Sequence, residues 1–252
     1  CVQRATAGWD YEMIVQYVEI YYNDVLWDLL VPRRNADYGR SKALSSLGIR
    51  RHSETKRLYV EGATQIAVDP TDADAVQNLL AAAAPRRSVA STNTNDVSSR
   101  SHAVLVLLLK GTNEVLGEVV HSTLTLVDLA GSERVEKSGV VGEQLKEAGG
   151  ISRSLSALTN VFDALVDKRS HVPFRNSKLT YLLTDALSHG KALVLTNVSP
   201  EPEFAAETEK SLLFAQRVKK VKLGKARRDV KYKGSGTAVG AKRTASRGGR
   251  RA

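Results

Sequence analysis

Four runs of aliphatic and β-branched residues most constrain how this chain can fold. They span Met13 to Ile20, Ala103 to Leu109, Thr123 to Leu129 and Ala192 to Val198. Runs of this kind, with few polar interruptions, are typical of strands that are buried on both faces of a sheet. We therefore predict that these four segments form strands of a sheet that is covered on both faces.

Helical patterns lie between and after these runs, over residues 72–84, 145–165, 177–187 and 205–221. The first is rich in Ala and Leu, and Pro85 is expected to end it. The second has apolar residues at steps of three and four, which form one apolar stripe along a helix. The alternation of strands and helices predicts a layered α/β fold and leaves the order of the strands open.

The positive charge is concentrated near the C-terminus. The chain carries a net charge of +10, and residues 217–252 hold 14 basic residues against one acidic residue. Beyond Gly224 there is almost no large apolar residue, so this segment cannot bury enough surface to offset its ordering entropy. We predict that residues 225–252 are disordered and favour a polyanionic partner, such as nucleic acid, an anionic membrane or an acidic protein polymer.

Cysteine content and hydropathy indicate the compartment. Cys1 is the only cysteine, so no intrachain disulfide can form, which fits a reducing compartment. No apolar run approaches the roughly 20 residues that span a bilayer, and the start lacks a signal-peptide pattern. We expect a soluble intracellular protein without a membrane partner, and, because Met13 is the only methionine, a segment that precedes residue 1.

Two polar segments adjoin the predicted strands. Asp128 ends one apolar run and Gly131 follows three residues later, a pattern in which the carboxylate can bind Mg²⁺ and a backbone N–H can approach a γ-phosphate. Asn95 to His102 brings hydroxyl, amide, guanidinium and imidazole groups together just before another run. Each segment alone also fits an ordinary turn, or a capped polar loop with a structural histidine, and the pair is more specific.

Residues 95–102 and 128–133, in this order, resemble the two nucleotide-sensing switches of kinesins. The resemblance covers roughly residues 10–225, and residues 171–180 are similar to the loop and helix that meet the microtubule. Residues 86–90 and 214–218 resemble the branch whose motor lies at the C-terminus of the heavy chain. The resemblance implies a P-loop NTPase-like α/β motor fold with a mostly parallel central sheet flanked by helices. A partial motor domain would span residues 1–224, followed by the basic tail.

The resemblance also implies roles for residues of the first switch. Ser99 would bind Mg²⁺ and the γ-phosphate, while Ser98 and Asn95 would arrange the switch and the attacking water. Arg100 would close onto Glu133 as a salt bridge that links the two switches. The protein would act by positioning, with water as the nucleophile.

In the second switch, Asp128 would hold the Mg²⁺ shell and the backbone N–H of Gly131 would sense the γ-phosphate. The implied cofactors are ATP and Mg²⁺, and the implied activity is a microtubule-stimulated ATPase. The implied quaternary state is a homodimer formed through a coiled coil upstream of residue 1. The implied location is the cytoplasm and the microtubule cytoskeleton, the spindle included.

Microtubules are the implied partner, and cations in two groups match the surfaces that bind them. The first group is Lys137, Lys168, Arg169, His171, Arg175 and Lys178, and the second is Arg50, Arg51, Lys56 and Arg57. Each cation alone is more typical of solvated surface. Their clustering favours attraction to acidic tubulin, which should weaken as salt is added.

One departure from the family is large. The 252 residues contain no G-x-x-x-x-G-K-[ST] phosphate loop, which kinesins have before the point that matches Cys1. We therefore expect an incomplete sheet and a chain that is inactive alone, binding ATP weakly or not at all. A nucleotide-independent microtubule-binding protein remains an alternative. A nucleic-acid-binding protein is a third reading, but the tail lacks interleaved aromatic residues beyond Tyr232.

Overall fold

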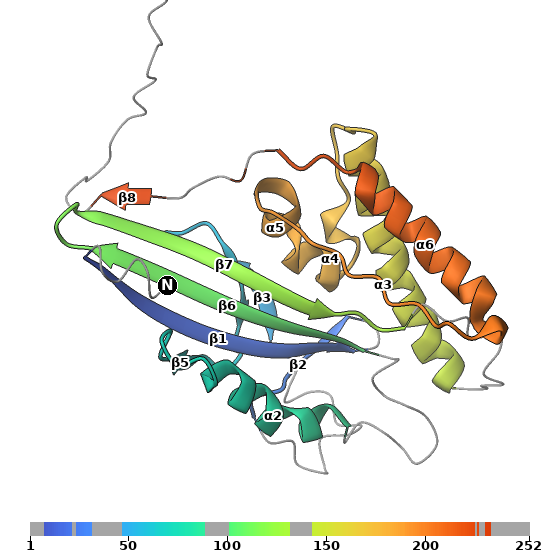
Figure 1. The fold of residues 1–252 in the computed structure, drawn as a ribbon, viewed down its shortest axis with the longest axis horizontal. Coiled ribbons are helices and arrows are strands. Elements are labelled where there is room, and N and C mark those ends of the chain that lie inside the picture. The colour runs from blue at the N-terminus through green and yellow to red at the C-terminus, as the bar shows by residue number, and fades with distance from the viewer. Residues whose placement is uncertain are drawn as a thin grey trace, which may run out of the picture.

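The chain forms a long sheet with helices packed against both of its faces (Figure 1). The computed structural model describes residues 8–21, 24–31, 47–88, 101–131, 143–224, 226 and 230–232. The strands are β1 (Trp9–Tyr21), β2 (Val25–Asp28), β3 (Gly48–Arg51), β4 (Leu58–Glu61), β5 (Ile66–Val68), β6 (His102–Asn113), β7 (Glu118–Asp128) and β8 (Val230–Tyr232). The helices are α2 (Ala75–Ser88), α3 (Glu143–Val166), α4 (Lys178–Leu182), α5 (Thr184–His189) and α6 (Ala205–Lys220), with 3₁₀ turns η4 (Phe174–Asn176) and η5 (Pro202–Phe204).

The central sheet has the strand order β2-β1-β6-β7-β8, and β5 also pairs with β1. Strands β3 and β4 form a separate hairpin. All pairings between described strands are antiparallel, so the expectation of a mostly parallel sheet is wrong for this part of the chain. The reason is clearest between β6 and β7, because the four residues from 114 to 117 that join them are too few for the crossover that parallel strands need.

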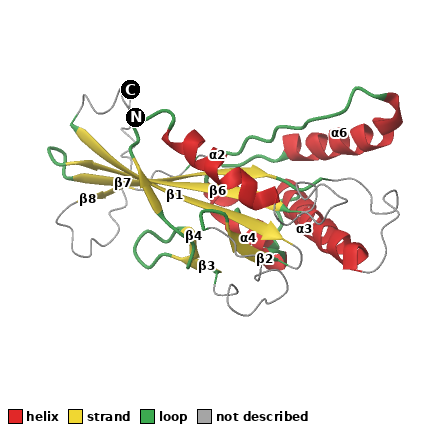
Figure 2. Ribbon diagram, turned by 90° about the horizontal axis from the view of Figure 1, so that it is seen from below, coloured by secondary structure: helices red, strands yellow, loops and turns green. Residues whose placement is uncertain are grey.

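Two apolar clusters lie on opposite faces of β1. Val18 belongs to a cluster that includes Leu158 and Phe162 of α3 and Leu179 of α4. Tyr17, the neighbouring residue, packs with the cluster that α2 contributes to. Because successive side chains of a strand point to opposite faces, helices cover both sides of the sheet, as the two views in Figures 1 and 2 also show. The predicted α/β fold with a central sheet flanked by helices is confirmed.

The predicted strand over residues 192–198 is wrong. The segment has no strand pairing among the described residues, and Leu193 and Leu195 are 84% and 79% exposed. Its composition is that of a strand, but a strand also needs a neighbouring backbone to complete its hydrogen bonds. The other three predicted strands are confirmed as β1, β6 and β7.

The predicted helices differ from the structure at two points. Pro85 lies inside α2 and does not end it, because Arg86 and Arg87 of the following turn are held by the carbonyl oxygen of Leu29 and by Asp128. The helix predicted over residues 177–187 is divided into α4 and α5, where the Thr184 hydroxyl bonds to a preceding backbone carbonyl and competes with the helical pattern. The other two helices are confirmed as α3 and α6.

Part of the basic tail is ordered. Residues Val230–Tyr232 form β8, which pairs with Glu118 to Val120 of β7, so the prediction of disorder is wrong for these three residues. Most of residues 225–252 lie outside the described residues. Within the described part of the chain, no helix has the length and apolar content to cross a membrane.

Candidate functional site

The structure describes only some of the predicted site residues. Asn95, Ser98, Ser99, Arg100, Glu133 and Lys137 lie outside the described residues. Asp128 and Gly131 are described, as are the other predicted cations of both groups. The described part of the candidate site comprises the end of β7, the start of β6 and the elements around them.

Asp128 lies at the carboxyl end of β7, opposite Ala103 of β6. Its Oδ2 pairs at 2.5 Å with Nη1 of Arg87, which comes from the last turn of α2 and also donates to the Ser101 carbonyl oxygen. The Asp128 side chain is 68% exposed, whereas that of Arg87 is 16% exposed. Carboxylate oxygens are Mg²⁺ ligands, so this open carboxylate is of the type that the predicted metal site needs, and the Arg87 guanidinium pairs with it. No local sequence pattern indicates this long-range pair.

The start of β6 is anchored by buried polar groups. Ser101 and Glu19 are both fully buried, and the Ser101 hydroxyl donates to the Glu19 carboxylate at 2.7 Å. Burial raises the pKa of the nearby Tyr17 hydroxyl, while Arg87 acts in the opposite direction. These contacts fix the point where the first predicted switch segment joins the sheet.

His102 joins three elements. The backbone N–H of Ala130 donates to its Nδ1 at 2.9 Å, and its Nε2 lies 2.7 Å from the Ser154 hydroxyl of α3. The ring is 2% exposed, and burial, followed by the charge of Arg87, lowers its pKa to about 4. The ring is therefore neutral near pH 7. These hydrogen bonds agree with a structural role for His102, which is one of the roles that the sequence allows.

The first group of cations begins where α3 ends. Lys168 has a φ of 52°, and the N–H groups of Lys168 and Arg169 bond to the carbonyl oxygens of Leu165 and Ala164. This is a Schellman cap, in which glycine usually takes the left-handed position. Both cations are exposed, and Arg169 pairs with Asp167 at 2.6 Å.

The next cations lie on η4 and at the start of α4. The guanidinium of Arg175 lies 5.5 Å from the ring centroid of Tyr181, an arrangement that favours a cation–π contact. Ser177 and Thr180 form a reciprocal capping box that begins α4 just before Lys178. The positions of Arg175 and Lys178 are thus set by local hydrogen bonds and packing.

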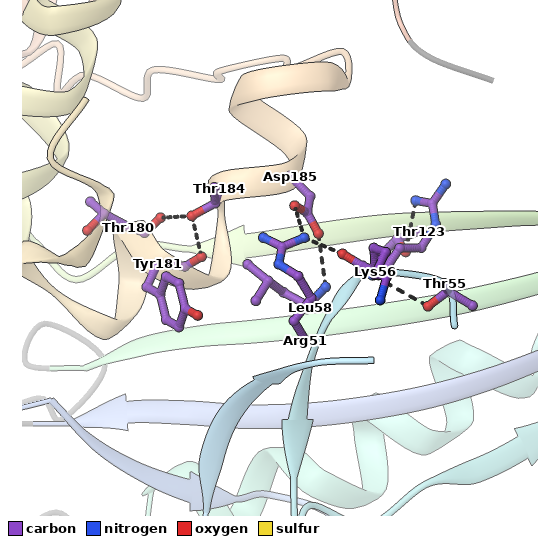
Figure 3. Close-up of polar contacts among 10 residues, drawn as sticks. Arg51, Thr55, Lys56, Leu58, Thr123, Thr180, Tyr181, Thr184 and Asp185 are labelled. Atoms are coloured by element: carbon purple, nitrogen blue, oxygen red, sulfur yellow. Dashed lines mark hydrogen bonds and ion pairs between the residues drawn. The ribbon is translucent and has the colours of Figure 1, made fainter. Parts of the chain in front are cut away.

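The β3–β4 hairpin carries the second group and is held against α5 by Asp185 (Figure 3). Asp185 Oδ2 accepts the Leu58 N–H at 2.9 Å, and its Oδ1 pairs with Arg51 Nη1 at 3.0 Å. On the other side, Arg57 donates to the His121 carbonyl oxygen of β7 at 2.7 Å. No sequence pattern predicts the role of Asp185, because nothing local relates it to a hairpin more than a hundred residues away.

The two groups of cations meet near α4. Arg50 of β3 pairs with Glu61 at 2.9 Å, and this hydrogen bond raises the pKa of the Arg50 guanidinium. Strand β3 packs against α4, which carries Tyr181, the ring that Arg175 lies over. Lys56, an exposed residue with a φ of 57°, lies in the turn of the hairpin. The structure thus brings together cations that are far apart in the sequence, at a surface suited to an acidic partner.

Known proteins match the chain over most of its length. The family described as the kinesin motor domain matches residues 1–221. The chain is 43% identical to the kinesin-like protein KIN-14D of Arabidopsis thaliana over 234 residues, which are 91% of this chain and 29% of that protein. It therefore spans less than a third of this relative.

Solved structures agree with the sequence comparison. The C-terminal motor and motor homology domain of Kar3Vik1, fused to a synthetic heterodimeric coiled coil, is 38% identical, with a TM-score of 0.71 over 86% of this chain and 54% of that chain. A KIF14 dimer in a two-heads-bound state with AMP-PNP on a microtubule is 31% identical, with a TM-score of 0.75 over 90% of this chain and 63% of that chain. The resemblance to C-terminal motors is confirmed.

Proposed function

The chain belongs to the kinesin motor domain family, and from this premise we propose that it is the part of an ATP-driven microtubule motor that carries the nucleotide switches and the filament-binding face. The observation that carries the proposal is the packing of β3, which holds Arg50, against α4, beside Arg175 and Lys178, in a chain of this family. The similar KIF14 structure, solved on a microtubule, supports the same partner.

The cations act collectively in this proposal. A single exposed ion contact is worth about 0–1 kcal/mol, so no one residue accounts for binding. Several cations on the end of α3, on η4 and on the hairpin attract an acidic filament together, and salt screens that attraction. Asp185 supports this surface indirectly, since it holds the hairpin beside α5.

The nucleotide site involves Asp128 and Gly131. Asp128 would hold Mg²⁺, which neutralises phosphate charge when it is bound, and the Gly131 N–H would contact the γ-phosphate. The phosphate-loop motif does not occur in these 252 residues, so we infer that the chain alone binds ATP weakly. Leu193 and Leu195 are exposed, and apolar surfaces of this kind bind other protein segments. We infer that another segment of the motor covers these two side chains.

Dimerisation and location follow from the same proposal. We propose that the motor acts as a homodimer joined by a coiled coil, and that it works on microtubules in the cytoplasm, the spindle among them. The dimeric state of the similar KIF14 structure supports the first statement. Analytical ultracentrifugation of a longer protein that includes this chain would test it, and a monomer at micromolar concentration would contradict it.

Co-sedimentation with microtubules tests the filament-binding face. Arg175→Ala and Lys178→Ala should each weaken binding by up to about fivefold, which corresponds to the loss of one exposed ion contact. Lys110→Ala is the matched control, because this exposed lysine of β6 pairs with Glu12 at 2.7 Å and belongs to neither group of cations. Equal weakening by all three substitutions would mean that the chain binds only through its total charge.

A nucleotide-independent microtubule-binding protein is the second candidate, favoured by the missing phosphate-loop motif. The purified chain should show no ATP hydrolysis above background under either reading. Hydrolysis that Glu133→Ala abolishes would show that the site works without this motif and would remove the second candidate. A phosphate-loop motif in the full-length protein would separate the two readings, since only the first requires one.

A further inference from the structure

The His102 ring forms a bridge with a defined polarity. Its Nδ1 accepts the Ala130 N–H at 2.9 Å, so the single proton of the neutral ring lies on Nε2. Nε2 therefore donates to the Ser154 hydroxyl, 2.7 Å away. The burial that lowers the pKa of His102 favours this neutral form. One side chain thus connects the backbone after β7 to the middle of α3.

The bridge is buried throughout. His102, Ala130 and Ser154 are all at most 5% exposed, so water cannot readily replace either hydrogen bond. A buried polar group that loses its partner is destabilising, which means that the two bonds tend to persist or break together. An apolar side chain of similar size would fill the space but could make neither bond.

The two ends of the bridge differ in function under the proposal made above. Ala130 directly precedes Gly131, whose N–H would contact the γ-phosphate. Ser154 belongs to α3, which packs against η4 and α4 and ends at the Lys168 cap. A change in the backbone at Ala130 would therefore disturb a bond to the helix that leads to the filament-binding face.

We propose that His102 is a positioning residue that ties the turn containing Ala130 and Gly131 to α3, so that the turn and the helix move as one unit. The role in switching rests on the proposed function. The tie itself can be tested without nucleotide or microtubules.

Amide exchange of the whole chain, followed by NMR, tests the tie. Ser154→Ala removes only the far end of the bridge and should accelerate exchange of the Ala130 amide about tenfold, or about 1.4 kcal/mol. The amides of Val104 and Val106 in β6 should not change. Ser156→Ala is the matched control, because Ser156 is an exposed serine on the same helix. An unchanged Ala130 amide, or equal acceleration of all core amides, would overturn the proposal.

A second variant tests whether both bonds belong to one bridge. His102→Asn keeps an acceptor near the Ala130 N–H but is too short to reach Ser154, so it should accelerate Ala130 exchange as Ser154→Ala does. The double variant should add little to either single change. Full additivity would overturn the proposal, as would a ¹⁵N spectrum that places the His102 proton on Nδ1. Failure of the chain to bind microtubules would instead count against the proposed function, and the exchange results would still decide the tie.

Discussion

Asp185 holds the β3–β4 hairpin against α5 through two unequal contacts. One is the hydrogen bond from the backbone N–H of Leu58, a residue that is 4% exposed. The other is the ion pair with Arg51, in which the two side chains are 41% and 30% exposed for Arg51 and Asp185. Because solvent screens the ion pair more strongly, the backbone bond should contribute most of the stability.

The expected magnitudes follow from these exposures. A hydrogen bond to a charged group contributes about 1.5–3 kcal/mol, whereas an exposed ion pair contributes about 0–1 kcal/mol. Asp185→Ala should therefore lower the free energy of unfolding by about 2–3 kcal/mol. Arg51→Ala should lower it by less than about 1 kcal/mol. Asp185→Asn should fall between them, since its amide oxygen can still accept the Leu58 N–H.

Urea denaturation of the three variants, followed by circular dichroism, measures these differences. Equal slopes of the free energy against urea would show that the variants share one folded state and one unfolding transition. An Arg51→Ala variant that loses as much stability as Asp185→Ala would refute the reasoning, because the ion pair would then be the main contact.

Three further predictions concern His102, Lys168 and the basic tail. Folding lowers the pKa of His102 from 6.5 to about 4. Between pH 6.5 and about pH 4, therefore, the unfolded chain binds a proton at His102 and the folded chain does not. The free energy of unfolding consequently falls as the pH drops through this range. The free energy of unfolding should be about 2 kcal/mol lower at pH 5 than at pH 7, and this difference should shrink in His102→Asn. A variant that loses as much stability between pH 7 and pH 5 would contradict the assignment of this pH dependence to His102. Lys168→Gly should raise the free energy of unfolding by about 1 kcal/mol by relieving the left-handed backbone, yet weaken microtubule binding; an unchanged melting temperature would contradict the first part. Truncation after Gly224 should lower microtubule affinity and its salt dependence, and unchanged values of both would show that the tail makes no contact.

Local patterns in the sequence were sufficient to predict the elements whose own residues show a clear apolar run or stripe. The aliphatic runs predicted β1, β6 and β7, and the apolar stripe predicted α3. The antiparallel arrangement could also have been anticipated at one point, because Gly117, with a φ of 62°, marks the short turn between β6 and β7.

Other features depend on contacts that no local pattern encodes. Residues 192–198 have the composition of a strand, but pairing depends on which backbone lies beside them. Pro85 ends a helix in most sequences, and here Arg86 and Arg87 hold the following turn through distant partners. In the candidate site, Asp128 was predicted from its position after a strand, whereas its pairing with Arg87 follows from the fold alone.

Microtubule co-sedimentation of this chain with ADP, with a non-hydrolysable ATP analogue and without nucleotide tests the central claim most directly. Each condition should be measured at low and at moderate salt. A chain that carries the filament-binding face without a phosphate loop should bind in all three nucleotide conditions alike, and more weakly at the higher salt. Absence of binding by the folded chain at low salt would contradict the proposed function, and affinity that differs between nucleotides would contradict the inference that the chain alone binds ATP weakly.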